Sequence, residues 1–350
     1  MKKYIKCSIN YAEGERMKGF KRAKYRAFIV VLCSLFLMSC ESHVEKKVDG
    51  VKLEKGAIIQ NEGGIYSNYN LHEGSFNKIE NDEIISLFDS KSGNYITQKD
   101  GKYSSYYLGK VEELKGVKLE DIDLKLSPNG KYLSYFRKEE NILKLNIISL
   151  KDGSLIEIKS NVAISDTYLD WVDEDTIIYY GISEDRVNGV FKYNVSDEKE
   201  DLFYKLDGGI VQFVKNIQTG VICIEETIDN VKVVKFLDKD GTEKGILPPD
   251  ITYISDIITD GTDYYFLGKV KGNNNSLYRI HNNIIKRMVF DFPAKIDYDK
   301  GLSMDSKGNI LFIGSSSKNS KNEEIYKVTK EGSISEAKAS VKEYAFVKYQ

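Results

Sequence analysis

The sequence predicts an all-β fold, and more narrowly a single β-propeller of seven four-stranded blades, with six blades as the alternative. Runs rich in Tyr, Ile and Val alternate with Asn/Asp/Gly turns, and no long stretch has apolar residues at helical spacing. The runs recur with a period of about 42 residues. A four-stranded unit cannot bury both of its faces alone, and stacking such units radially leaves only short edges.

The clearest unit starts at Asp121 and reads DIDLKLSPNG, KYLSYFRKEEN, ILKLNIISLKDG and SLIEIKS, which is four strands and three turns. The same order returns four times towards the C-terminus, beginning near Tyr168, Ile210, Tyr253 and Tyr298. Seven turns that join a third to a fourth strand predict seven blades. They fall, 39 to 49 residues apart, near Glu73, Glu112, Asp152, Asp197, Asp240, Asn282 and Glu331.

The two ends of the repeat region complement each other. The first unit, roughly Val51 to Asn81, has three strands instead of four. After the last complete unit the chain continues with VKEYAFVKYQ, which is one strand left over. We therefore expect the C-terminal strand to pair in the first blade and close the ring.

A family resemblance rests on LSPNGKYLSYF, Leu126 to Phe136, which resembles the SPDGK strand-turn-strand motif of TolB-type propeller repeats. DWVDEDTIIYYG and MDSKGNILFIG look like degenerate copies of the same motif. The resemblance implies a fold and no particular activity, because the Asn-Gly pair supplies the positive φ angles of a tight turn. Since TolB-type propellers often have six blades, it also supports the six-blade alternative. WD-repeat propellers are disfavoured by the single tryptophan, Trp171.

The N-terminus has the pattern of an export signal. Five basic residues between Lys18 and Arg26 precede an uncharged run of about thirteen residues, which is too short to span a bilayer as a helix. The run ends in Leu37, Met38, Ser39 and Cys40, which resemble the lipobox of bacterial lipoproteins. The resemblance implies cleavage before Cys40 and a lipid on its thiol. We expect a signal peptide over residues 1–40, a flexible tether over 41–56 and the propeller over 57–350. Within the first segment, we expect translation to start at Met17 and not at Met1.

Charge and cysteine content exclude several kinds of partner. Residues 1–40 hold nine of the 51 basic and two of the 53 acidic residues, so the remainder has 42 basic and 51 acidic residues and a formal net charge of −9. This balance argues against nucleic acid as a partner. After removal of the leader and lipidation of Cys40, Cys223 is the only free cysteine, which leaves no disulfide framework and no cysteine metal site.

No catalytic, metal-binding or cofactor-binding residue is predicted. The motifs of zincins, α/β-hydrolases, P-loop proteins and dinucleotide-binding proteins are missing. His72 and His281 fall in turns of different blades. The acidic group from Asp166 to Asp175 (Asp166, Asp170, Asp173, Glu174, Asp175) and the segment Asp238–Gly241 are read either as calcium ligands or, preferably, as solvated turns.

Three hypotheses of function remain. The favoured one is a non-enzymatic, monomeric scaffold that binds a protein or peptide at the cell envelope, held to the membrane by the lipid on Cys40. The alternatives are a carbohydrate-active propeller enzyme, hydrolase or lyase, and a small-ligand or ion-binding sensor accessory. The Lys, Ile, Asn and Tyr bias favours the outer face of a Gram-positive cytoplasmic membrane over the periplasm. Glu41 follows the cysteine, so the aspartate often linked to inner-membrane retention is absent.

Overall fold

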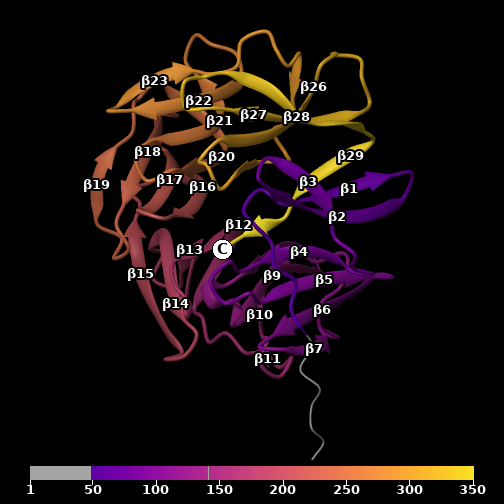
Figure 1. The fold of residues 1–350 in the computed structure, drawn as a ribbon. Helices are drawn as coiled ribbons and strands as arrows, with labels where there is room; N and C mark the ends of the chain where they lie inside the picture. The colour runs from indigo at the N-terminus through magenta and orange to yellow at the C-terminus, as the bar shows by residue number, and fades with distance from the viewer. Residues whose placement is uncertain (1–48, 141) are drawn as a thin grey trace, which may run out of the picture. The chain divides into compact units, whose positions relative to one another are not determined.

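The computed structural model describes residues 49–140 and 142–350. In this part of the chain seven β-sheets stand around a common centre, as Figure 1 shows, and there is no α-helix. The one helical segment is a 3-10 turn, η1 (Pro128–Gly130), inside the SPNG motif. The predicted all-β propeller of seven four-stranded blades is confirmed, and the six-blade alternative is wrong.

The sheets follow one another along the chain, and the strands of each are named from the centre outwards. Blade 1 holds β29 (Glu343–Phe346), β1 (Ile58–Glu62), β2 (Ile65–His72) and β3 (Ser75–Lys78). Blade 2 holds β4 (Ile84–Phe88), β5 (Tyr95–Lys99), β6 (Lys102–Tyr107) and β7 (Lys110–Glu113), with β30 (Lys348–Tyr349) added parallel to β4. Blade 3 holds β8 (Ile122–Leu126), β9 (Tyr132–Glu139), β10 (Ile142–Ser149) and β11 (Leu155–Ile156).

The remaining four blades keep this order. Blade 4 holds β12 (Val162–Trp171), β13 (Thr176–Ser183), β14 (Asn188–Asn194) and β15 (Lys199–Lys205). Blade 5 holds β16 (Ile210–Ile217), β17 (Gly220–Glu226), β18 (Lys232–Leu237) and β19 (Glu243–Ile246). Blade 6 holds β20 (Ile251–Thr259), β21 (Tyr264–Val270), β22 (Ser276–His281) and β23 (Ile284–Arg287). In blade 7 the inner strand is split into β24 (Lys295–Ile296) and β25 (Leu302–Met304), followed by β26 (Ile310–Ser315), β27 (Glu323–Val328) and β28 (Ile334–Val341).

The hydrophobic core is divided among the contacts between neighbouring blades. Each of seven buried clusters combines side chains from two adjacent blades, including a cluster between blades 7 and 1. Tyr179 and Tyr180 show how one strand serves two clusters. Tyr179 packs towards blade 3 and Tyr180 towards blade 5, because adjacent residues on a strand point to opposite faces.

Burial changes from the middle of a blade to its edge. The second strands, such as β13 and β17, are buried on both faces over most of their length. The outermost strands β7 and β19 read KVEE and EKGI, and all of their residues are exposed. Short, charged edge strands of this kind discourage pairing with other chains.

The last strands close the ring, as expected from the sequence. β29 pairs antiparallel with β1, from Ile58 opposite Phe346 to Asn61 opposite Glu343, and Figure 1 shows the C-terminal strand beside the first one. Just after β29 the Val347 N–H donates to the Ala57 carbonyl at 3.0 Å. The sequence did not suggest the second contact, in which β30 lies parallel to β4 of blade 2. The chain end therefore joins two blades.

The strand directions define two faces of the propeller. We call the face at which the innermost strands begin the start face. It is made of the segments between the second and third strands of each blade and of those that lead from one blade to the next. The opposite face, the termini face, carries the remaining turns, the segment before β1 and Gln350. Within the predicted tether, Leu53 is buried between blades 1 and 2 on this side.

Most of the predicted turns between third and fourth strands lie where the sequence placed them. In blade 2 the turn falls at Leu108 and Gly109, so that Glu112 is a residue of β7. The error arose because VEEL extends the alternating pattern of β6 past a turn that Gly109 makes at φ 90°. The lipobox residues Leu37, Met38 and Ser39, together with Cys40, lie outside the described residues.

A C-terminal truncation tests the closure. Removal of residues 343–350 takes away β29 and the buried Tyr344, Phe346 and Val347, and exposes the edge of β1. Burial of such side chains contributes about 1.5–3 kcal/mol each, so the loss is roughly 5 kcal/mol or more. We expect the melting temperature to fall by at least about 10 °C.

Removal of residues 348–350 alone is the matched control. It takes away β30, the edge-on contact of Tyr349 with Phe88, whose ring centroids are 5.8 Å apart, and the hydrogen bonds of Tyr349 and Gln350, but leaves β29 in place. We expect a smaller drop in thermal unfolding by circular dichroism. An unchanged melting temperature in the longer truncation would refute closure by β29.

Candidate functional site

The innermost strands carry local irregularities that turn polar side chains inwards. Register shifts interrupt the inner strands of blades 2 to 6, for example between Ile164 and Leu169 in β12. In β8 the shift lies between Ile122 and Lys125, and Asp123 within it has a φ of 52°. A bulge breaks the strict alternation of side chains and re-aims them. Charged residues of several blades thereby meet near the centre.

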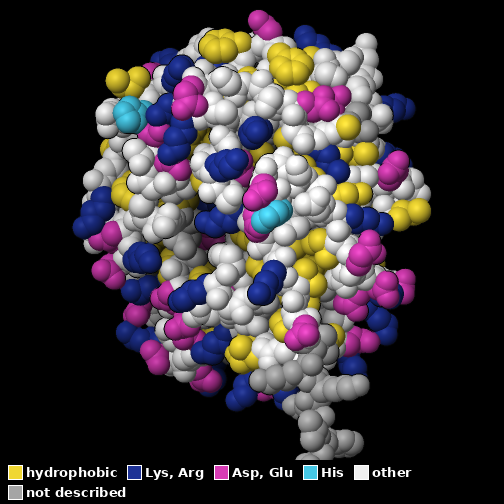
Figure 2. Space-filling view, in the orientation of Figure 1, with side chains coloured by type: hydrophobic (Ala, Val, Ile, Leu, Met, Phe, Trp, Pro, Cys, Tyr) yellow, Lys and Arg dark blue, Asp and Glu magenta, His cyan; other side chains and the backbone are white. Residues whose placement is uncertain are grey.

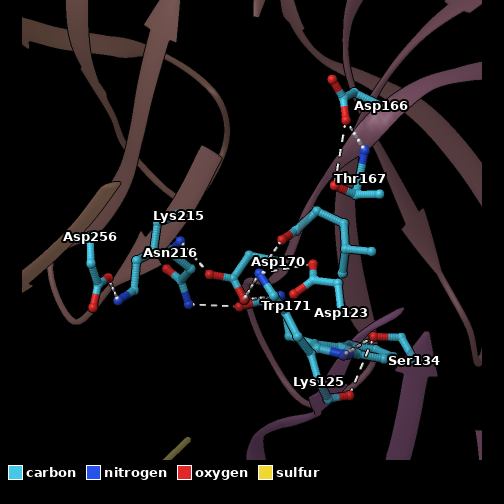
Figure 3. A network of polar contacts seen from close by, with 11 residues as sticks. Asp123, Lys125, Ser134, Asp166, Thr167, Asp170, Trp171, Lys215, Asn216 and Asp256 are labelled. Atoms are coloured by element: carbon cyan, nitrogen blue, oxygen red, sulfur yellow. Dashed lines mark hydrogen bonds and ion pairs between the residues drawn. The ribbon is translucent and has the colours of Figure 1, made fainter. Parts of the chain in front are cut away.

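Asp170 joins blade 4 to blades 3 and 5. One oxygen, Oδ2, accepts the Asn216 backbone N–H of β16 at 2.8 Å, and Oδ1 accepts the Trp171 N–H at 3.0 Å. Lys125 Nζ from β8 lies 3.7 Å from Oδ1 and also donates to the Leu169 carbonyl. Figure 3 shows these side chains converging from three inner strands. The carboxylate is thus a joint between three consecutive blades.

Asp256 repeats the arrangement two blades later. Its Oδ2 accepts the Leu302 N–H of β25 at 2.7 Å, its Oδ1 accepts the Ile257 N–H at 2.9 Å, and Lys215 Nζ of β16 donates to it. The separations Asp170–Asn216 and Asp256–Leu302 are both 46 residues. Lysine and aspartate therefore alternate over blades 3 to 6, with each aspartate bound to the next blade.

Blade 7 ends the alternation at Gly301. Gly301 directly precedes Leu302 and has no side chain. A Cβ added to Gly301 would lie 2.8 Å from Asp256 Oδ2. Gly301 also has a φ of 71°, in the left-handed region that favours glycine. The carboxylate can reach the backbone of blade 7 only because this residue is glycine.

Electrostatics favours the charged form of the lysine in this network. Burial alone would lower the pKa of Lys125, but the carboxylates of Asp170, Asp123 and Asp256 act against it and raise the pKa above its ordinary value. Trp171 anchors the same region, because its Nε1–H donates to Ser134 Oγ of β9 at 2.9 Å. The charges of the inner strands compensate one another within the protein.

The arrangement suits a structural joint better than acid–base chemistry. General acid–base catalysis needs a carboxyl group that is free to exchange a proton with a substrate. Asp170 and Asp256 are each held by two backbone N–H groups and a lysine. Across residues 49–140 and 142–350, no group of three His, Cys, Asp or Glu side chains is placed to hold a metal ion.

The acidic residues that the sequence grouped together have separate partners. Asp173 Oδ1 accepts the N–H groups of residues 175 and 176, Glu174 accepts from Asn129, and Asp175 pairs with Lys131. Asp166 lies apart from the joint that Asp170 forms. In Figure 3 its dashed lines lead to Thr167 alone. In the other acidic segment, Asp238 accepts the N–H groups of residues 240 and 242. The preferred turn interpretation therefore matches the partners of Asp173 and Asp238.

The two described histidines and the one described cysteine lie away from the inner strands. His72 pairs with Glu54, and His281 pairs with Asp263, at the termini-face ends of β2 and β22. Cys223 lies in the middle of β17, and burial raises its pKa to about 12. A thiol with so high a pKa is protonated at neutral pH and acts as a small hydrophobic side chain. Among the residues that the structure describes, no helix is long and apolar enough to span a membrane.

The start face, by contrast, exposes many apolar side chains. Of the eighteen large hydrophobic side chains that are exposed among the described residues, thirteen lie in or beside its connecting segments. The other five lie on or beside the outermost strands. The thirteen are Ile65, Tyr66, Leu119, Ile122, Ile142, Ile182, Ile210, Ile228, Val231, Ile246, Tyr253, Phe290 and Phe292.

Sequence reasoning missed this surface, although a signal for it existed. Turns prefer Gly, Asn, Asp and Ser, yet the connection TIDNV between β17 and β18 contains Ile228 and Val231. A branched aliphatic residue in an exposed turn contributes nothing to the core. Such residues recur at several connecting segments of the start face.

Two open depressions lie beside blade 7. One, of about 410 Å³, runs between β23 and β28 and is lined by Met288, Phe290 and Phe292 among others. The other, of about 280 Å³, is lined mainly by polar residues, including Asp297 and Glu323. Burial raises the pKa of Glu323.

Figure 2 shows one face of the molecule, on which basic and acidic side chains are interspersed without a continuous basic area.

No protein-family model and no curated protein matches the sequence. Solved structures similar to the chain include TolB from Acinetobacter baumannii, with 11% identity over 81% of this chain and 79% of TolB and a TM-score of 0.45. An oligogalacturonate lyase from Vibrio parahaemolyticus has 13% identity over 83% of this chain and 86% of the lyase, with a TM-score of 0.48. Similarity at this level assigns neither an activity nor a ligand to the chain.

Dipeptidyl peptidase 4 from Porphyromonas gingivalis is also similar, with 11% identity over 83% of this chain and a TM-score of 0.47. The chain spans only about half of that protein, 53% of its length. TolB-type propellers are the group that the SPNGK segment resembles, and a TolB structure is among the similar ones.

Substitution of Asp170 tests the joint. Asp170→Ala leaves the Asn216 N–H without its acceptor and removes one carboxylate partner of Lys125, in a site where the aspartate side chain is only 9% exposed. Breaking a buried charge pair from one side typically costs roughly 3 kcal/mol or more, and we expect a loss of about that size in urea unfolding. The matched control is Asp166→Ala in the same strand, for which we expect less than about 1 kcal/mol. Equal effects of the two substitutions would contradict the role of Asp170.

Proposed function

We propose that this chain is a lipid-anchored extracytoplasmic propeller that acts as a protein- or peptide-binding scaffold at the cell envelope, with the start face as its binding surface. The observation that carries the proposal is the gathering of thirteen exposed large hydrophobic side chains at that face. Single exposed apolar residues are common on protein surfaces, but apolar areas of larger extent mark interaction sites.

The position of the chain ends supports the same surface. Residues 49–57 lead into β1 at the termini face, where Glu54 contacts both His72 and Tyr349. A chain held to the membrane through Cys40 is therefore attached at the termini face. The start face is the side of the propeller opposite to this point of attachment.

The inner strands favour a binding role over a carbohydrate-active enzyme. Glycoside hydrolysis needs two carboxyl groups that face a sugar across a pocket. In the inner strands, Asp170 and Asp256 instead bind backbone N–H groups of the next blade and pair with lysines. The polar groups at the centre serve the fold, which leaves recognition to the surface.

Substitutions on the two faces test the binding surface. The double variant Ile210→Asp/Ile228→Asp places charges on the start face, and Leu108→Asp/Ile284→Asp places them on the rim of the termini face. After cross-linking and capture from detergent-solubilised membranes, we expect one partner protein with the unsubstituted chain and with the rim variant. We expect at least a tenfold lower recovery with the start-face variant. Repeated capture that yields nothing, or an equal loss in both variants, would contradict the proposal.

The lipid anchor has a separate test. Cys40→Ala removes the only thiol at the lipobox, so we expect no incorporation of radiolabelled palmitate and no processing of the leader. Cys33→Ala, in the uncharged run, is the matched control and should leave both unchanged. Labelling of the Cys40→Ala protein would show that Cys40 is not the lipidated residue.

A further inference from the structure

Three neighbouring connections form one continuous part of the start face. The hairpin end of blade 4 pairs Ile182 with Asn188, and the Asn188 side chain donates to the Gly209 carbonyl at 2.8 Å. Gly209 belongs to the connection from blade 4 to blade 5. A Cβ added at Gly208 in that connection would lie 2.6 Å from Ile228 Cδ1 of the next hairpin. Residues 182–188, 206–210 and 227–231 therefore adjoin one another, and we call them the blade 4–5 patch.

Each of the three segments exposes branched aliphatic side chains. The exposed fractions are 41% for Ile182, 50% for Ile210, 75% for Ile228 and 56% for Val231. Their apolar surface stays in water when the protein is alone, which is unfavourable by about 25 cal/mol per Å² relative to burial. Contact with a partner that has an apolar side removes this surface from water.

The same patch carries carboxylates that the fold does not use. The side chains of Glu184, Asp185, Asp207 and Asp229 are exposed, and none of them makes a hydrogen bond or an ion pair with another described residue. Three basic residues, Arg186, Lys205 and Lys232, lie in or beside the patch, and Lys232 is paired with Glu226, so the charge of the patch remains negative.

Four carboxylates in the termini-face turns, by contrast, bind the chain itself. Asp173, Asp238 and Asp305 each accept two N–H groups of their own turn. Asp263 pairs with Arg279 and His281. The blade 4–5 patch therefore places four exposed carboxylates without such partners beside four exposed aliphatic side chains.

The start face as a whole is electrically polarised. Its connecting segments between residues 79 and 250 hold thirteen acidic and four basic residues. Those between residues 271 and 342 hold one acidic and four basic residues. The blade 4–5 patch lies in the acidic part, so its field attracts cationic groups and repels anionic ones.

We propose that the blade 4–5 patch docks a Lys/Arg-rich amphipathic segment of a protein partner. This inference rests on the proposed function and names the partner's chemistry. The partner's aliphatic side chains cover Ile182, Ile210, Ile228 and Val231, and its basic side chains pair with the surrounding carboxylates. An anionic lipid surface and a second copy of this acidic chain both have the wrong sign of charge for the patch.

The test uses a defined probe. A fluorescent 18-residue peptide of Lys and Leu, arranged so that a helix is amphipathic, is titrated with the protein in anisotropy measurements at low and high salt. A peptide of the same composition in scrambled order and a Glu/Leu counterpart are the controls for amphipathicity and for charge. We expect binding of the amphipathic Lys/Leu peptide, weaker binding of the scrambled one and no binding of the Glu/Leu one.

Three variants locate the site. The first neutralises the patch with Glu184→Gln, Asp185→Asn, Asp207→Asn and Asp229→Asn, and the second removes aliphatic surface with Ile210→Ser and Ile228→Ser. The third is a charge-matched control outside the patch, with Glu73→Gln, Glu112→Gln, Asp197→Asn and Asp240→Asn. At low salt we expect the patch variant to bind about tenfold more weakly and the control variant to bind within about twofold of the unsubstituted protein. High salt should remove most of that difference.

The outcomes separate this inference from the proposed function. Equal weakening by the patch and control variants, or equal binding of the scrambled peptide, overturns the patch as the site. If the Ile210/Ile228 variants abolish partner capture while the neutralised patch leaves it unchanged, the start face still binds a protein but the cationic partner is wrong. If the neutralised variant does not fold, two other measurements decide whether the patch binds the cationic peptide. They are the peptide affinity of Asp229→Asn alone and the salt dependence of binding to the unsubstituted protein.

Discussion

The structure depends on one constraint, which is that every blade is apolar on both faces. A sheet such as β12–β15 has buried tyrosines pointing to both of its neighbours, so no blade is stable unless it lies between two others. An open row of seven such sheets would leave two apolar faces in water. The pairing of β29 with β1 removes this problem, because it completes blade 1 and brings it against blade 7. Ring closure is therefore a condition for the whole core and not a local contact.

The centre of the ring has a different requirement, because seven inner strands bring their side chains into a small space. Charged groups are retained there only when they are paired and hydrogen-bonded. Asp170 and Asp256 meet this requirement by accepting N–H groups of the next blade and by pairing with Lys125 and Lys215. The resulting joints hold adjacent blades in register. The polar groups of these four inner strands are thus part of the framework.

Most of the fold was predictable from the sequence because its signals are local and repeated. The period of the strand runs gave the blade number, and the missing strand near Val51 together with the spare one after Val341 gave the closure. The predicted turn near Glu112 was misplaced by a few residues, because an alternating pattern does not show where a turn interrupts it. The five acidic residues from Asp166 to Asp175 are close in sequence, yet a bulge and a turn direct them to different partners.

The sequence alone determined the strand content, the repeat and the order of the blades, because these follow from the spacing of apolar and turn residues along the chain. It also carries the lipobox pattern at Cys40. Only the tertiary structure decided which residues meet across blades. Asp170 reaches Asn216, 46 residues away, and Ile182, Ile210 and Ile228 share one patch although they belong to three connections. The physical reason is that side chains in a ring are brought together by the angle between blades, which leaves no mark in the spacing of the sequence.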